Sequence, residues 1–390
     1  MAGRAPVTVD VAYAVVGAGV VGLAVAERLA AHGPVMLIER REACARETSA
    51  HNTGIVHAGM FYETGSLKHR LCIEGARLLH EWCDARVVPL RRTGKLIVAV
   101  EPADLDGLER VWARAEANGV PGMRRLAPTE ARAMEPAIRF AEAIACDASS
   151  VVDQAAYGRS LESAARTAGV LIAYHHTVTG AEPDAEGFTL ALRDAGGAAS
   201  TLRCAMLVNA AGHGAPQLAQ AAGYPLDGDA RTPAVRQRVN RGRYYNFATP
   251  DLARVVSRPV YPVPPGSADV QRHQASAGGL GLHLSVDIDG VAHLGPDTTW
   301  LPDDAPLDYR AEDDAREAFL AAGRRLIPGL QSDDLVPGQV GYRPKLAPAD
   351  GTPPDFSIWR DRAYVHLGGI ESPGLTASLA IARHVEALLS

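Results

Sequence analysis

The first 40 residues combine two apolar runs with a glycine-rich turn. Val11–Val16 is a short apolar run, which is typical of a strand that is covered on both faces. Residues 20–31 carry Ala, Leu and Val at helical spacing, and Gly33 ends the run. Val35–Ile38 is a second apolar run of strand length. The pattern predicts a β–α–β unit at the start of the chain.

The rest of the chain alternates between helical and strand patterns. Residues 47–65 lack a regular period and are crowded with His, Asn, Ser, Thr and Gly, which predicts a long structured loop near the glycine turn. Between residues 231 and 300 short strand patterns are broken by Gly and Pro, which favours an antiparallel sheet. Helices are predicted at 67–83, 105–117, 152–168 and 375–389, and strands at 96–100, 170–174, 188–193, 201–208 and 363–367.

Composition and charge narrow the class of protein. A chain of 390 residues exceeds one simple core and suggests two domains. Its 47% hydrophobic and 22% charged residues are ordinary for a globular protein. The net charge is −6 and no basic patch stands out, so a nucleic-acid partner is not expected. An acidic substrate would have to be met by local Arg or Lys side chains.

Cysteine usage and hydropathy add expectations about location. The five cysteines are widely spread and form no C-x-x-C pair, which predicts free thiols in a reducing compartment, with no disulfide framework and no metal site. No segment approaches the ~18 apolar residues of a membrane span. The short polar start of the chain leaves no room for a signal peptide, so a cytoplasmic location is expected. Peripheral contact with a membrane surface is compatible with this sequence.

The glycine turn has the spacing of a dinucleotide site. Gly17, Gly19 and Gly22 form G-x-G-x-x-G between a strand and a helix. In that motif the glycines allow a tight turn, close approach of the backbone to a pyrophosphate, and packing of helix on strand. The helix N-terminus offers amide groups to the phosphates. Glu39 ends the next strand, where a carboxylate accepts hydrogen bonds from ribose hydroxyls.

Two later segments favour FAD over NAD as the dinucleotide. Residues 210–212 end a strand in small residues, which lets a ligand approach the backbone. The loop at 368–374 leads into a C-terminal helix whose positive end would face the ligand. The predicted cofactor-binding residues are Gly17, Gly19, Val20, Val21, Gly22, Glu39, Arg40, Thr48, Ser49, His51, Asn52, Val178, Ala210, Ala211, Gly212, Gly369, Gly374, Leu375 and Thr376.

Nucleotide-binding segments therefore occur at the start, the middle and the end of the chain. The predicted class is α/β (α+β overall), with a Rossmann-like FAD-binding domain and an interleaved substrate domain built on a mostly antiparallel sheet. We expect residues 9–86, 143–230 and 340–390 in the FAD-binding domain. Residues 87–142 and 231–339 would then form the substrate-binding domain.

The loop after the β–α–β unit carries a family resemblance. Ser49-Ala50-His51-Asn52-Thr53-Gly54-Ile55-Val56-His57-Ala58-Gly59, followed by Tyr62 and Gly65-Ser66-Leu67-Lys68, resembles the L-2-hydroxyglutarate dehydrogenase/oxidase family, a branch of the D-amino-acid-oxidase-like FAD superfamily. Segments 241–245, 260–264, 281–283 and 294–296 support it. The chain departs from the family in two ways. Residues 341–345 and 369–376 look more like uncharacterised relatives, and residues 266–279 carry an insertion of small and polar residues.

The resemblance implies oxidation of a small 2-hydroxy acid by hydride transfer to the flavin. Such a reaction needs a base for the hydroxyl proton and cations for the carboxylate. His57 is the candidate base, because imidazole titrates near working pH, and His283 is its rival. The remaining candidates are Arg343 and Lys345 for the carboxylate and for charge near the flavin, Tyr62 and Tyr245 as hydroxyl donors, and Lys68 at the start of a helix over the pocket.

Three hypotheses stay open from the sequence. The first is a dehydrogenase or oxidase of a small carboxylate substrate such as L-2-hydroxyglutarate. The second is an FAD-dependent amino-acid or amine oxidase on the same scaffold. The third is a flavin-binding redox sensor without catalytic activity. The electron acceptor can be oxygen, a quinone or a carrier protein, and a covalent link between the flavin and a histidine is left open.

Overall fold

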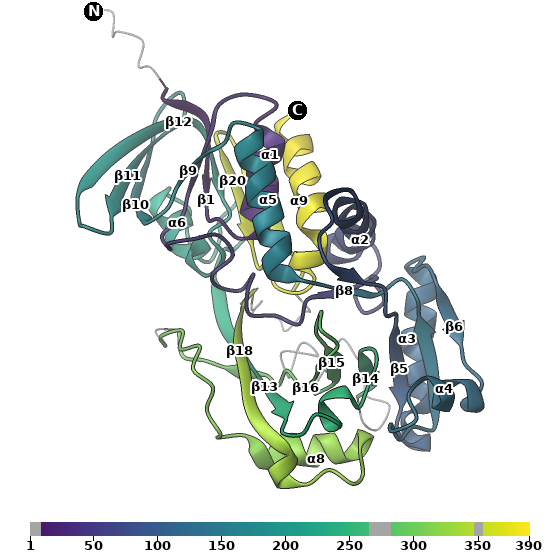
Figure 1. The fold of residues 1–390 in the computed structure, drawn as a ribbon. Helices are drawn as coiled ribbons and strands as arrows, with labels where there is room; N and C mark the ends of the chain where they lie inside the picture. Colours follow the sequence, from purple (N-terminus) through teal and green to yellow (C-terminus); the bar gives the residue numbers. More distant parts are fainter. Residues whose placement is uncertain (1–8, 265–281, 304, 347–353) are drawn as a thin grey trace, which may run out of the picture.

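The structure is a computed structural model that describes residues 9–264, 282–303, 305–346 and 354–390. Gly281 and the insertion at 266–279 lie outside the described residues. Two large sheets organise the described chain, one in the upper half and one in the lower half of the view in Figure 1. A smaller sheet consists of β3 (Ile55–Val56), β8 (Ser150–Val152) and β4 (Leu90–Arg91).

The first sheet has a parallel centre and an antiparallel extension. Its central strand β1 pairs in parallel with β2 on one side and with β12 on the other. The remaining order places β9 beyond β2, β20 and β19 beside β12, and the antiparallel pair β11 and β10 at the far edge. The strands are β1 (Val11–Val16), β2 (Val35–Ile38), β9 (Leu171–Ala173), β10 (His176–Pro183), β11 (Phe188–Asp194), β12 (Ala199–Asn209), β19 (Ser357–Asp361) and β20 (Tyr364–Gly368).

Helices cover one face of this sheet. Figure 1 shows α1 (Val20–Leu29) beside α5 (Gln154–Thr167) and α9 (Gly374–Leu389), and α2 (Leu67–Arg86) packs against α9. The short helix α6 (Ala215–Ala221) contacts β10 and β20. Helix α1 is apolar on nearly all sides, as expected for a helix enclosed by two neighbours.

The second sheet is mixed. Its order is β17-β13-β16-β15-β14-β5-β7-β6, and β18 pairs with β13. Most neighbours are antiparallel, as predicted for residues 231–300, but β14 pairs with β5 in parallel. The strands are β5 (Lys95–Ala99), β6 (Met123–Arg125), β7 (Glu142–Cys146), β13 (Gln237–Phe247), β14 (Val260–Pro262), β15 (Leu284–Val286), β16 (Ala292–Leu294), β17 (Thr299–Trp300) and β18 (Leu335–Leu346). The helices α3 (Leu105–Ala117), α4 (Pro128–Met134) and α8 (Arg316–Leu326) belong to this half of the chain.

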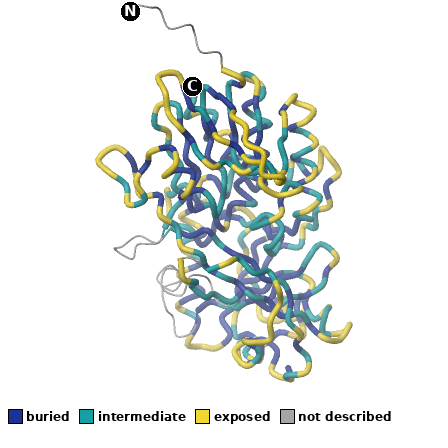
Figure 2. The backbone as a smooth tube through the Cα atoms, turned by 90° about the vertical axis from the view of Figure 1, so that its left-hand side faces the viewer, coloured by how far each residue is buried: buried dark blue, intermediate teal, exposed yellow. Residues whose placement is uncertain are grey.

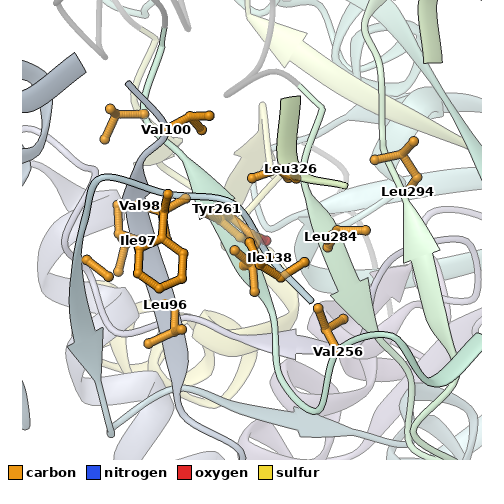
Figure 3. Packing of buried hydrophobic residues seen from close by; sticks show 14 of the residues in the cluster. Leu96, Ile97, Val98, Val100, Ile138, Val256, Tyr261, Leu284, Leu294 and Leu326 are labelled. Atoms are coloured by element: carbon orange, nitrogen blue, oxygen red, sulfur yellow. The ribbon is translucent and has the colours of Figure 1, made fainter. Parts of the chain in front are cut away.

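Among the described residues, the second sheet packs on one apolar core and the first sheet on two, one against each of its faces. Figure 2 shows buried backbone running through both halves of the molecule, with exposure concentrated in the connecting loops. In the core of the second sheet, Leu96 and Val98 of β5 lie near Tyr261 of β14 and Leu284 of β15 (Figure 3). The core of the second sheet meets the first-sheet core that contains α1 where β3 and β8 carry residues of both clusters.

The sequence-predicted elements are found with their ends shifted by a few residues. The predicted helix at 67–83 continues to Arg86, and the predicted strand at 96–100 begins one residue earlier at Lys95. Three larger elements were not predicted, namely β10, β18 and α8. The mixed α/β class is confirmed.

The domain bounds stay a prediction. Sheet membership places β7 and all of β18 in the second sheet, whereas the predicted FAD-binding domain includes residues 143–146 and 340–346. Among the helices of the described ranges, none has the length and apolar character needed to cross a bilayer. All five cysteines are free thiols.

The contact between α2 and α9 generates the first testable prediction. A Cβ at Gly75 would overlap Thr376 O and lie 2.6 Å from Ala377 Cα. We expect Gly75→Ala to destabilise the fold by about 1–3 kcal/mol, because an added methyl group must push the two helices apart. Thermal unfolding of the two proteins measures this difference.

The matched control is Gly329→Ala, since an added Cβ there meets no atom within 4 Å. This variant should unfold at the same temperature as the parent protein. Equal melting temperatures for Gly75→Ala and Gly329→Ala would contradict the close helix contact.

Candidate functional site

A large cavity of about 830 Å³ lies where the two sheets meet. Its walls include Gly17 and Ala210 from the first sheet, and Tyr244, Tyr261 and Arg343 from the second. The parallel strands β1 and β12 end at it, which is where open α/β sheets bind their ligands. The cavity therefore joins a nucleotide-type strand edge to a separate sheet that can supply other chemistry.

The glycine turn brings three backbone segments into contact. Gly17 has φ +108°, a conformation that a residue with a side chain rarely adopts. A Cβ at Gly17 would overlap Ala210 O, and a Cβ at Gly22 would overlap Gly17 O. The glycines are thus required for the close approach of β1, α1 and the end of β12.

The start of α1 faces the cavity with polar groups around it. Gly19 caps the helix without a side chain, and the Val20 amide donates to Ser49 Oγ at 3.1 Å. The Ala18 amide donates to Glu39 Oε2 at 2.8 Å, which holds this carboxylate beside the turn. Amide donors at a helix N-terminus suit a pyrophosphate, and the carboxylate suits a ribose.

The loop predicted at 47–65 lies along the cavity and is held by its own hydrogen bonds. Thr48 Oγ1 donates to Tyr342 O at 3.1 Å, and the Asn52 side-chain amide donates to Ser49 O at 2.9 Å. The His51 ring lies 4.1 Å from the ring of Tyr309. These contacts order the loop between the two sheets.

The cavity has the length and the donor set that FAD requires. It extends from Val178 of β10 past the glycine turn to the N-terminus of α9. All predicted cofactor-binding residues line it except Gly369, whose amide donates to Gln237 Oε1 at 2.9 Å. Residues of two helix N-termini, Val20 of α1 and Gly374 of α9, both face the cavity. The residues present therefore fit FAD.

His57 lies in the cavity wall close to α9. Its amide donates to Thr376 Oγ1 at 3.0 Å. Its Nε2 is 3.3 Å from Ser372 Oγ and its Nδ1 is 3.4 Å from Lys95 Nζ. Burial, then the charges of Lys95 and His283, lowers the pKa of His57 well below 6.5. The imidazole is neutral at pH 7, which is the form that can accept a proton.

His283 lies in the same wall, with its ring tilted against an aromatic ring. Its ring centroid is 3.8 Å from that of Tyr261, and Lys95 Nζ lies 4.1 Å from the Tyr261 centroid on β14. The structure thus joins both histidine candidates through Lys95 and Tyr261. Sequence reasoning missed Lys95; the one available signal was a lysine at the head of an otherwise apolar strand.

Arg343 on β18 also faces the cavity. Its Nη1 donates to Asn240 Oδ1 at 2.6 Å, and both terminal nitrogens reach Asp297 O at 3.4 Å. Within the described ranges no carboxylate forms an ion pair with it. The guanidinium can therefore hold an anionic group.

Lys345 and Lys68 share one buried carboxylate that sequence reasoning missed. Lys345 Nζ donates to both oxygens of Glu371 at 2.6 Å, and Lys68 Nζ donates to Oε1 at 2.9 Å. All three side chains line the cavity and are at most 10% exposed. Burial alone raises the pKa of Glu371, but the two ammonium groups hold it at about 2. Two lysines thus share one ionised carboxylate.

The two tyrosine candidates lie in different places. Tyr62 lines the cavity, and its hydroxyl is 3.3 Å from Ser372 Oγ. Tyr245 does not line it: the residue is fully buried in the core of the second sheet, and its hydroxyl donates to Asp313 Oδ1 at 2.8 Å. Neighbouring residues of a strand face opposite sides, so Tyr244 lines the cavity instead.

Comparison with known proteins agrees with this geometry. Residues 12–388 match the DAO family, described as FAD dependent oxidoreductase. The chain is 32% identical to the mitochondrial L-2-hydroxyglutarate dehydrogenase of Arabidopsis thaliana, over 95% of this chain and 82% of that protein. It is 26% identical to L-2-hydroxyglutarate dehydrogenase of Salmonella houtenae, over 96% and 92% of the two chains.

Solved structures show the same fold. The L-alpha-glycerophosphate oxidase of Mycoplasma pneumoniae with FAD bound superposes with a TM-score of 0.82 at 26% identity, over 97% of this chain and 94% of that chain. The glycine oxidase of Geobacillus kaustophilus shares the fold at 21% identity, with a TM-score of 0.75 over 98% and 95% of the chains. The FAD-binding prediction is confirmed, and the chain belongs to the DAO family of FAD-dependent oxidoreductases.

Proposed function

We propose that this protein oxidises a small 2-hydroxy acid to the 2-oxo acid, with L-2-hydroxyglutarate as the leading substrate. The observation that carries the proposal is the combination of a neutral imidazole, His57, and an unneutralised guanidinium, Arg343, in the wall of one cavity. The curated relatives named above are L-2-hydroxyglutarate dehydrogenases, which supports the same substrate class.

The chemistry divides between the cofactor and the chain. Bound FAD supplies the hydride acceptor. His57 accepts the proton of the substrate hydroxyl at Nε2, the ring nitrogen that lies beside Ser372. Ser372 and Tyr62 form a short hydrogen-bonded chain with that nitrogen and help to orient the hydroxyl. His283 stays the rival for the base.

The cations of the cavity explain a preference for acids. Arg343 binds the carboxylate beside the reacting carbon through its two terminal nitrogens. The Lys68–Glu371–Lys345 trio offers a second positive region, because its two ammonium groups outweigh one carboxylate. A dicarboxylate such as L-2-hydroxyglutarate would use both regions, whereas a monocarboxylate would use one.

A titration of the holoenzyme tests the substrate class. We expect anaerobic addition of L-2-hydroxyglutarate to bleach the flavin absorbance, and L-lactate to do so only at much higher concentration. Bleaching by 2-amino acids and not by 2-hydroxy acids would contradict the proposal and favour an amino-acid oxidase. Mixing the reduced protein with oxygen, a quinone or a carrier protein then identifies the electron acceptor.

A second prediction concerns the base. His57→Ala should keep the bound flavin but lose about 100-fold or more in the rate of flavin reduction, because proton transfer by a positioned base contributes that much. Anaerobic stopped-flow absorbance measures the rate. His283→Ala is the comparison variant, and a larger loss there with near-normal reduction in His57→Ala would transfer the role to His283.

A third prediction concerns Arg343. Removing a charge-assisted bond to the substrate carboxylate should raise KM in Arg343→Met by about 10-fold or more. Steady-state kinetics with L-2-hydroxyglutarate measure the change. The control is Arg125→Met, since Arg125 lies in an exposed ion pair with Glu109 outside the cavity. An unchanged KM in Arg343→Met would remove this residue from the substrate site.

A further inference from the structure

Lys95 is a fully buried lysine at the head of β5. Its side chain is enclosed in the core of the second sheet, and the residue is 1% exposed. Nζ lies 4.1 Å from the ring centroid of Tyr261 and 5.9 Å from that of Phe61. In the described chain no carboxylate pairs with it, so aromatic faces and one imidazole nitrogen replace the usual counter-ion.

The titratable groups around Lys95 come from every element packed against it. They are His57 in the loop after β3, Cys72 on α2, Cys146 on β7 and Tyr261 on β14, with His283 tilted against Tyr261. Burial lowers the pKa of Lys95 to about 8, while the two cysteines act in the opposite direction. Burial keeps the thiol pKa values of Cys72 and Cys146 high, so both are neutral at working pH.

The protonation state of Lys95 affects which ring nitrogen of His57 carries the proton. Lys95 Nζ lies 3.4 Å from His57 Nδ1, and Nε2 lies on the other edge of the ring beside Ser372. An ammonium group has only donors, so Nδ1 must accept and the ring proton must sit on Nε2. A neutral amine has a lone pair, so Nδ1 can keep the proton and donate it to Nζ.

We propose that Lys95 is a positioning residue that selects the tautomer of His57. The neutral amine allows the proton to stay on Nδ1, which leaves the Nε2 lone pair facing the cavity, where a base must act. The ammonium form fixes the proton on Nε2 and blocks that lone pair. The proposal rests on the proposed function only where it gives Nε2 the role of base; the tautomer itself depends on Lys95 alone.

The direction of the pH dependence follows. The neutral form of Lys95 increases as pH rises through about 8, so the base-competent fraction of His57 increases with it. The neutral fraction of Lys95 is about one tenth at pH 7 and about nine tenths at pH 9, a rise of about tenfold. The low pKa of His57 itself adds no change in this range, because the ring is already neutral at pH 7.

Nitrogen NMR of the holoenzyme labelled with ¹⁵N-histidine tests the tautomer without any substrate. The His57 signals are assigned by their loss in His57→Gln. We expect the proton on Nε2 at pH 7 and on Nδ1 at pH 9.5, and no exchange between the two in Lys95→Met. A tautomer that stays the same across this range in the parent protein, or that still switches in Lys95→Met, overturns the proposal.

Flavin reduction under anaerobic conditions gives the second readout. The parent protein and the surface control Arg125→Met should both show the tenfold rise between pH 7 and 9. Lys95→Met should lose the rise, and Lys95→Arg should be slow at every pH because its guanidinium stays charged. A merely structural role predicts the reverse order, with Lys95→Arg retaining more rate than Lys95→Met, and that result contradicts the proposal.

The two measurements distinguish a failure of the proposed function from a failure of the proposal about Lys95. If no 2-hydroxy acid reduces the flavin, the proposed function fails while the NMR result still decides the role of Lys95. If the Lys95 variants do not retain FAD, the tautomer switch of the parent protein remains the deciding measurement. A switch with the predicted direction supports the proposal, and its absence overturns it.

Discussion

The structure depends on one close backbone approach. At the carboxyl edge of the first sheet, Gly17 lies against Ala210 and Gly22 lies against Gly17, with no room for a Cβ at either glycine. This contact seats α1 directly behind β1 and aligns the end of β12 beside the turn. Because β1 and β12 end together, the cavity opens at that edge, and the helix N-terminus points its amides into it. The second sheet forms the opposite wall of the cavity, and its strand β18 brings Arg343 to that wall.

The sequence was most informative where one local constraint decides the structure. The G-x-G-x-x-G turn predicted β1, α1 and β2, because each glycine has a backbone reason to be there. The strand β18 was missed, because Pro337 and Pro344 read as breaks; both are tolerated since β18 pairs only with β13 in the described sheet. Lys95 and Glu371 were missed for another reason. Nothing near either residue in the sequence reports its partners, which come from segments far along the chain.

The cavity wall carries charges of both signs, although the molecule as a whole is negative. The whole chain has a net charge of −6, yet among the described residues the cavity wall carries as many cationic as acidic side chains. Lys68 and Lys345 pair there with the buried carboxylate Glu371, Arg343 forms no ion pair within the described ranges, and Lys95 adjoins the wall at His57. Buried cations are tolerated when each finds a compensating group, and here those groups differ: a shared carboxylate, aromatic faces or amide oxygens. Local arrangement therefore determines which ions the cavity accepts, and the global charge does not. A dinucleotide with two phosphates and an anionic substrate would both lower the cost of burying these cations.

The cofactor end and the substrate end of the cavity are mechanically linked through Thr376. Its side chain accepts the His57 amide, and its residue belongs to the first turn of α9, whose packing on α2 at Gly75 admits no extra atom. A shift of α9 would therefore move the imidazole relative to Lys95, whose own position is fixed by β5 inside the core of the second sheet. The 3.4 Å contact between the two nitrogens joins the two halves of the molecule, since one nitrogen is carried by each half. Such a contact tolerates little displacement, because a hydrogen bond weakens steeply as its length and angle depart from the optimum. The same rigid packing that holds the dinucleotide thus also sets the geometry on which the base depends.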